Sequence, residues 1–302
     1  MQSAETRFNI VTGKGGVGKT LVACLNGLRS ARNGQKTLIC ELNTNETLAS
    51  KFRTQPSNGR LVQVSERLWI VNIRPDEALM EYANLKLGMP SISKIVFGNP
   101  FVRALTEFVP GMSDLLMFGK AFNHEREVDQ KGHPVWDHVI IDAPATGHGL
   151  TFLKLPSIIA QAIPSGNMHD EAQSMHNLVT DKNKTRIDVV TIPEPLPIRE
   201  TKELYELLSS EKGLRIDRLI VNRCPETTLT MDQLDTLTQL DMSDDPVLAH
   251  LLEEQRYAHG AHARINTLNP LQLPTVRLPE LASLAIETFD QNALDSLIER
   301  FP

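Results

Sequence analysis

One glycine-rich run near the N-terminus combines residue types and a spacing that suit phosphate chemistry. It reads GKGGVGKT from Gly13 to Thr20, which matches the pattern GxxxxGK[ST] of a loop that wraps nucleotide phosphates. In such a loop, backbone N–H groups and the start of the following helix bind phosphate oxygens, while Lys19 reaches the β- and γ-phosphates. The Thr20 hydroxyl ligates Mg²⁺. The run therefore predicts an ATP and Mg²⁺ site that includes the residues Gly13, Gly15, Gly16, Val17, Gly18, Lys19 and Thr20.

A carboxylate expected at the same site is Asp142. It ends the apolar run Val139–Asp142 and is followed by a glycine-containing turn that reaches His148. An aspartate at that position can hold the Mg²⁺ shell, and a turn beside the γ-phosphate can order or relax with the nucleotide state. We therefore expect Asp142 to be the second metal-binding residue, and His148 to couple the nucleotide to a helical insert at residues 75–131.

A second lysine in the loop, Lys14, narrows the class of nucleotide-binding protein. KGGVGKT resembles the deviant Walker A motif of the MinD/ParA, nitrogenase iron protein and ArsA group. That resemblance implies a dimer that encloses ATP, in which Lys14 reaches across the interface to the nucleotide of the partner chain. The alternative is a solvated lysine at the tip of a loop, which is where lysines are usually found.

The turn after Asp142 separates the members of this group. Val139 to His148 reads VIIDAPATGH and resembles the switch II segment of the ArsA anion-transporting ATPase family, relatives of the cytosolic ATPases that deliver tail-anchored membrane proteins. Thr191–Thr201 resembles the family's strand-to-helix segment with its PE…ET pattern. Val221–Arg223 resembles the strand end whose asparagine reads adenine, which implies that Asn222 and Arg223 bind the nucleotide. Leu273–Glu280 resembles the late loop that closes over the base.

The chain departs from this family at switch I, the segment after the second strand. The family has an aspartate there that orients the attacking water, and the alignment of Leu38–Asn43 places Asn43 at that position. An asparagine carries no charge and takes no proton, so we expect slow hydrolysis, with a loss of roughly a hundredfold or more in rate. Glu41, or Glu46 after a local rearrangement, is the alternative water-positioning group.

The cysteines and histidines argue against thiolate chemistry, zinc binding and disulfides. Cys24, Cys40 and Cys224 are far apart and form no CxxC pair, so arsenite sensing by three thiolates, a zinc-joined dimer and a disulfide framework are all disfavoured. The other histidines show no metal-ligand spacing. We expect any dimer to close without zinc.

The elements that must position these residues follow from alternating patterns. Six apolar runs read as strands, and they are Phe8–Val11, Thr37–Glu41, Leu68–Ile73, His138–Asp142, Ile187–Ile192 and Leu219–Asn222. Helical patterns lie between them, at Lys19–Asn33 and at Ile198–Ser210, where Glu200, Glu203 and Glu206 are expected to face water and Leu204, Leu207 and Leu208 the core. This predicts an α/β fold of the P-loop NTPase class, a mostly parallel sheet flanked by helices in one domain over residues 1–302.

Residues 75–131 interrupt this alternation with mostly helical patterning, in a connection far longer than a strand-to-helix link needs. We expect an inserted helical subdomain. Its methionines and phenylalanines, among them Met80, Met89, Met112 and Met117, suit an adaptable groove for a hydrophobic protein client. They equally suit the subdomain's own core, and apolar periodicity does not separate the two.

Composition excludes several classes of protein. The chain has 302 residues with 41% hydrophobic content, and its formal net charge of −6, with scattered basic residues, argues against a nucleic-acid binder. Three scattered cysteines fit a reducing cytosol, so we expect a cytoplasmic protein. No apolar run is long enough for a bilayer span, so we expect any link to a membrane to go through a partner. The function expected is that of a dimeric ATPase that couples its nucleotide state to a protein client. Alternatives are a nucleotide-dependent regulatory or assembly scaffold and the catalytically degenerate half of a heterodimer, whereas a metabolic kinase is disfavoured.

Overall fold

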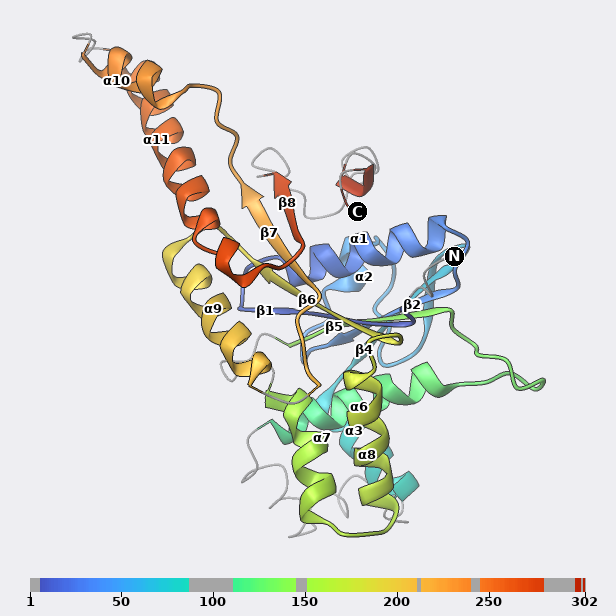
Figure 1. The fold of residues 1–302 in the computed structure, drawn as a ribbon. Helices are drawn as coiled ribbons and strands as arrows, with labels where there is room; N and C mark the ends of the chain where they lie inside the picture. The colour runs from blue at the N-terminus through green and yellow to red at the C-terminus, as the bar shows by residue number, and fades with distance from the viewer. Residues whose placement is uncertain are drawn as a thin grey trace.

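An eight-stranded sheet forms the centre of the computed structural model, which describes residues 6–86, 111–144, 151–210, 213–239, 245–279, 297–299 and 301 (Figure 1). The strands lie in the order β3-β4-β2-β5-β1-β6-β7-β8, and every neighbouring pair is parallel except β3 with β4. Their bounds are β1 Phe8–Gly13, β2 Thr37–Leu42, β3 Val62–Ser65, β4 Leu68–Ile73, β5 His138–Asp142, β6 Thr185–Thr191, β7 Arg218–Cys224 and β8 Thr275–Pro279.

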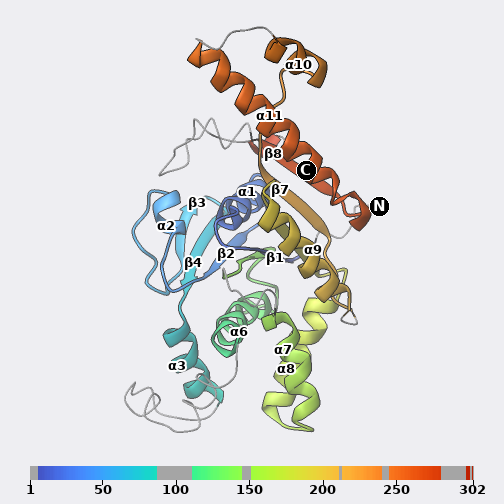
Figure 2. The same ribbon diagram turned by 90° about the vertical axis from the view of Figure 1, so that its left-hand side faces the viewer.

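Helices cover both faces of this sheet, which explains why its central strands are apolar on both sides (Figure 2). One face packs on α1 and α2, and the other packs on α6, α7, α8, α9 and α11. The bounds are α1 Lys19–Arg32, α2 Leu48–Lys51, α3 Pro75–Lys86, α6 Met112–Arg126, α7 Thr151–Ala162, α8 Asn167–Thr180, α9 Pro195–Ser209, α10 Met231–Gln239 and α11 Pro246–Asn266, with a 3₁₀ turn at Asn269–Leu271. The α/β class with a mostly parallel sheet is confirmed.

All six strands expected from apolar runs are present, whereas two further strands were not expected. The expectation of a late loop at Leu273–Glu280 is wrong for Thr275–Pro279, because this segment pairs with β7 as strand β8. Its side chains alternate between exposed and buried, with Val276 and Leu278 facing inward. An edge strand with one covered face shows this alternation rather than a continuous apolar run. Glu280 lies outside the described residues.

The described part of the segment 75–131 contains α3 and α6, and residues 87–110, including Met89, lie outside the description. Helix α6 packs directly under the sheet, where the ring of Phe118 meets that of Phe8 edge to face at 5.8 Å between centroids. Met112 and Met117 are buried in the same cluster. Helices α3, α6, α7 and α8 together form the lobe below the sheet (Figures 1 and 2). The described methionines of α6 therefore belong to a core.

A buried ionic cluster connects α1 to the strands on which it packs, on the face opposite the lobe. Asp188 on β6 is completely buried, and its carboxylate accepts hydrogen bonds from Arg218 at 2.7 and 2.9 Å, from Asn9 at 3.1 Å and from Asn26 of α1 at 3.2 Å. Burial alone would raise the pKa of Asp188, but the guanidinium groups of Arg186 and Arg218 hold it below its usual value. The charge is therefore satisfied by hydrogen-bond donors on β1, α1 and β7, with Arg186 of β6 as a further positive charge.

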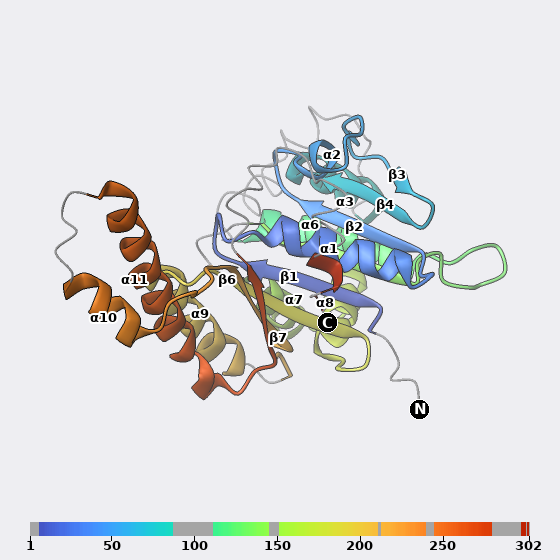
Figure 3. The same ribbon diagram turned by 90° about the horizontal axis from the view of Figure 1, so that it is seen from above.

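Helix α9 departs from its expected faces. Leu208 is buried as expected, but Leu207 is 39% exposed, so its assignment to the core is wrong. Glu200 was expected in water, yet its side chain is only 18% exposed and forms an ion pair. At the far end of the molecule, α10 and the long α11 project from the body (Figure 3). Within the described residues, no helix has the length and apolarity required to cross a bilayer.

Candidate functional site

The phosphate loop joins the end of β1 to the start of α1, as the sequence pattern predicts. Gly13 has φ +143°, and a Cβ there would lie 2.2 Å from the carbonyl oxygen of Val190. Gly18 has φ +99°, and a Cβ there would lie 2.3 Å from Nδ2 of Asn222. Both positions therefore require glycine. Helix α1 has no acidic residue in its first turn, so its N–H groups and dipole remain available to an anion.

Lys19 lies inside this loop rather than in solvent. It is 8% exposed, and its Nζ donates a hydrogen bond to the carbonyl oxygen of Lys14 at 2.9 Å. Burial lowers the pKa of Lys19, and the nearby Asp142 carboxylate opposes that shift. An ammonium group held at this depth is placed to bind an anion that enters the loop.

Thr20 and Asp142 meet at the corner where a metal ion is expected. The Thr20 hydroxyl donates to Oδ2 of Asp142 at 2.7 Å, while Oδ1 of Asp142 is buried without a hydrogen-bond partner among the described residues. Burial raises the pKa of Asp142 to about 7, with Glu41 adding to the shift and the Thr20 hydrogen bond and Lys19 opposing it. A hydroxyl beside an orphaned carboxylate oxygen fits the oxygen ligands that Mg²⁺ prefers. The donor set therefore fits the metal.

At the end of β2, where the switch I segment begins, the carboxylate of Glu41 is held by hydrogen bonds. Its carboxylate accepts hydrogen bonds from the backbone N–H of Thr47 at 2.9 and 3.0 Å, from the N–H of Leu48 at 3.3 Å and from the Thr47 hydroxyl. These groups lie at the start of α2, so the side chain of Glu41, which lies in the preceding strand, caps that helix. Burial raises the pKa of Glu41 despite these hydrogen bonds. Glu41 as a whole is 1% exposed, so its carboxylate is not free to contact a water molecule at the nucleotide site without losing these hydrogen bonds.

The rest of switch I is also held by hydrogen bonds. Oε1 of Glu46 accepts from the backbone N–H of Ser57 at 2.7 Å, and Asn72 donates from its side chain to the carbonyl of Asn43 at 2.9 Å. Asn43 itself is exposed, and its Oδ1 accepts a long 3.4 Å hydrogen bond from the N–H of Asn45. Of the three expected water-positioning groups, Asn43 is therefore the exposed one, and both glutamates serve the local structure.

Asn222 approaches the phosphate loop from β7. Its Nδ2 donates to the carbonyl of Val17 at 2.9 Å, and its side chain is buried against Gly18. The register of β7 against β8 shifts between Val221 and Cys224, and Arg223 within this irregularity has φ +55°. A bulge of this kind redirects side chains at the end of a strand. The structure thus brings Asn222 to the loop, while Arg223 is exposed beside it.

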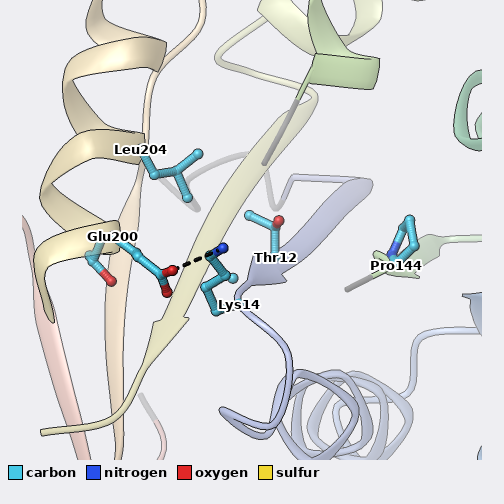
Figure 4. Close-up of a pocket in the computed structure, with 7 residues that line it drawn as sticks. Thr12, Lys14, Pro144, Glu200 and Leu204 are labelled. Carbon is cyan, nitrogen blue, oxygen red and sulfur yellow. Dashed lines mark ion pairs between the residues drawn. The ribbon is translucent and has the colours of Figure 1, made fainter. Parts of the chain in front are cut away.

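Lys14 forms a contact that sequence reasoning missed. Its Nζ lies 2.9 Å from Oε1 of Glu200, near the start of α9 (Figure 4). Both residues line one pocket at the end of β1, together with Thr12, Gly13, Pro144, Thr201 and Leu204. The PE…ET pattern placed Glu200 in the same family segment, but helical periodicity assigned it to the solvent face.

Some expected residues lie outside this site or outside the description. His148 and the turn residues 145–147 fall among the undescribed residues. Cys24, Cys40 and Cys224 are buried free thiols on three different elements, and burial raises the pKa of each. Within the described part of the chain, no group of three His, Cys, Asp or Glu side chains could hold a metal ion.

Comparisons with known proteins agree with this geometry. Residues 6–165 and 164–238 match the model of the anion-transporting ATPase family. ATPase BagA of Mycobacterium tuberculosis is 30% identical over 300 residues, covering 91% of this chain and 88% of BagA. ATPase GET3 of Kluyveromyces lactis is 30% identical over 256 residues, covering 73% of each chain. ATPase ARSA1 of Chlamydomonas reinhardtii is 24% identical over 311 residues, covering 82% of this chain and 40% of ARSA1.

Proposed function

This chain belongs to the ArsA family of anion-transporting ATPases, and we propose that it is a dimeric ATPase whose hydrolysis is slow or depends on a partner. ATP binding and ATPase function follow from the family. The Mg²⁺ requirement, the dimer, the slow rate and the protein client are our proposals. One observation supports the slow rate: the carboxylates of Glu41 and Glu46 both accept hydrogen bonds from backbone N–H groups, while Asn43 is uncharged.

The loop residues take defined roles in this proposal. The backbone of Gly15 to Thr20 and the ammonium of Lys19 would hold the phosphates, and Thr20 with Asp142 would hold Mg²⁺. A metal ion held by these two residues would supply positive charge against the charge that develops on the transferred phosphoryl group. Asn222, with its amide nitrogen bonded to Val17, would present its carbonyl oxygen to the base, with Arg223 nearby. Lys14 would serve the nucleotide of the partner chain.

The slow rate that we propose has a physical reason in the residues of switch I. A charged aspartate at position 43 would orient a water molecule and accept its proton, whereas an asparagine amide orients the water less strongly and accepts no proton. Glu41 would have to abandon the hydrogen bonds at Thr47 and Leu48 before it could take over that role. Those bonds involve a charged acceptor, so each is worth about 1.5–3 kcal/mol. The chain is therefore suited to hold ATP for long periods or to form a heterodimer with a partner that retains the aspartate.

The lobe below the sheet supports coupling to a protein partner. Helix α7 begins at Thr151, soon after Asp142 in sequence, and packs against α8 and α6. Ile158, an apolar residue of α7, is 54% exposed. A change at the end of β5 would thus reach this lobe through one short connection. We propose that nucleotide state changes the lobe's affinity for a protein, either a hydrophobic client or one specific partner in a scaffold.

Steady-state phosphate release tests the catalytic part of this proposal. We expect the wild type to lie near the background of a Lys19→Ala variant, and Asn43→Asp to turn over at least tenfold faster. Equal rates for wild type and Asn43→Asp, both well above the Lys19→Ala background, would contradict the proposal. That result would assign the attacking water to another group.

A further inference from the structure

The ion pair between Lys14 and Glu200 lies within one chain, and we propose that Glu200 is a positioning residue that holds Lys14 within its own chain until a second chain binds. The inference rests on the proposed function, in which Lys14 serves the nucleotide of the partner chain. It adds a regulatory step at that same site. Lys14 must leave Glu200 before it reaches across an interface, so the pair acts as a latch on dimer closure.

The two partners differ in how firmly they are held. Glu200 lies near the start of α9, whose Ile198 and Leu208 are buried, and its side chain is 18% exposed. The start of this helix is fixed further by Arg264, which donates to the carbonyl of Pro193 at 2.7 Å. Lys14 is 39% exposed at the side chain and has a long flexible stem. The carboxylate is therefore the fixed member, and the lysine is the one that moves.

The pocket around the pair places it at the nucleotide site. Thr12 and Gly13 lead directly into the phosphate loop, and Pro144 follows Asp142 at the end of β5 (Figure 4). Leu204, one turn after Glu200, adds an apolar wall. Lys14 thus points toward α9 and away from its own loop, where its carbonyl oxygen already accepts the hydrogen bond from Lys19. In this position the charge of Lys14 is neutralised by a carboxylate of the same chain.

The ion pair is weak enough that it would shift the dimerisation equilibrium without preventing dimerisation. A partly exposed ion pair changes an equilibrium by roughly two- to fivefold, about 0.4–1 kcal/mol. The phosphates of a bound nucleotide carry more negative charge than one carboxylate, so they would attract Lys14 more strongly once the second chain is near. Without nucleotide, Glu200 neutralises the lysine and disfavours association. The ion pair would therefore increase the difference in dimer affinity between the nucleotide-free and the nucleotide-bound protein.

Sedimentation of the full chain with Mg²⁺ and the non-hydrolysable ATP analogue AMP-PNP tests this inference. We expect Glu200→Gln to lower the dimer dissociation constant two- to fivefold at low salt, and the difference to disappear near 0.5 M NaCl as charges are screened. Glu206→Gln, an exposed glutamate on the same helix, is the matched control and should leave the constant unchanged. Adding Lys14→Gln to Glu200→Gln should remove the gain.

Carbodiimide coupling reports the contact itself. The reagent joins an ammonium and a carboxylate in direct contact as an amide, with the released water taken up as urea. We expect a Lys14–Glu200 linked peptide from the nucleotide-free wild type, and a severalfold lower yield once Mg²⁺ and AMP-PNP are added. Equal dissociation constants for wild type and Glu200→Gln, or a yield that persists in the dimer, would overturn the latch alone. If all variants bind AMP-PNP and none associates, the dimeric part of the proposed function fails, and the latch fails with it.

Discussion

Asn222 at the end of β7 donates a hydrogen bond to the carbonyl of Val17 inside the phosphate loop, although 205 positions separate them in sequence. The amide also occupies the space that a side chain at Gly18 would need, since a Cβ there would lie 2.3 Å from Nδ2. The shape of the loop is therefore set partly by β7, which lies two strands from β1 in the sheet. Variants at these two positions should not behave independently.

We expect Gly18→Ala to weaken ATP binding at least tenfold, because it combines a left-handed φ with a clash against Asn222. Gly34→Ala is the matched control: Gly34 also has a positive φ, but a Cβ added there would have no described neighbour within 4 Å. Fluorescent ATP titration should show near-normal affinity for the control. Because Asn222 would also bind the base, Gly18→Ala is compared in an Asn222→Ala background, where it should cost less ATP affinity than it does in the wild type; an equal cost in both backgrounds would contradict the clash.

The Thr20 hydroxyl should account for the Mg²⁺ dependence of ATP binding. Thr20→Val removes the group that bonds to Asp142 at 2.7 Å while it preserves side-chain volume. We expect its ATP affinity with Mg²⁺ to fall at least tenfold, about 1.4 kcal/mol, to the level measured with a chelator present. Thr20→Ser should stay within a few-fold of wild type. Calorimetric titration measures each affinity, and a Thr20→Val protein that still responds to Mg²⁺ would place the metal elsewhere.

Glu41 should affect stability and not turnover. Glu41→Gln replaces one acceptor oxygen by a donor NH₂ facing the N–H groups of Thr47 and Leu48, so we expect a loss of about 1–3 kcal/mol in the free energy of unfolding. Urea denaturation measures this loss. In an Asn43→Asp background, phosphate release at saturating ATP should stay within twofold after Glu41→Gln. A tenfold drop in that rate would instead make Glu41 part of the catalytic machinery.

His138 should give the protein an acid-sensitive stability. Burial, and then the charges of Arg186 and Arg218, lower the pKa of His138 to about 3, and its Nδ1 lies 2.5 Å from the Ser30 hydroxyl. The folded state keeps this histidine neutral, whereas the unfolded chain protonates it below about pH 6.5. Stability is therefore present above pH 6.5 and is lost as the pH falls toward 3, by about 2 kcal/mol between pH 7 and pH 5. The difference between wild type and His138→Asn in urea denaturation should shrink over that range, and a constant difference would contradict the neutral form.

The sequence predicted the six central strands because each is buried on both faces and so reads as an apolar run. Strands β3 and β8 were missed because each lies at an edge, where short alternating segments such as Val276 and Leu278 give a weak signal. The site could be predicted wherever a motif fixes the backbone, as at Gly13 to Thr20. Partners of charged residues were not predictable, because nothing in a helical pattern indicates that Glu200 turns toward Lys14 or that Glu41 caps α2.

The buried cluster around Asp188 bears on which parts of the molecule can move. Helix α1 contributes Asn26 to that cluster, so sliding α1 along the sheet would strip hydrogen bonds from a completely buried carboxylate. Breaking such an arrangement costs about 3–5 kcal/mol, which is comparable to the total stability that many proteins possess. We therefore expect the face of the sheet that carries α1 to stay rigid. In the proposed function, the movement that follows a change of nucleotide would then arise on the opposite face, where α7 starts close to Asp142 along the chain.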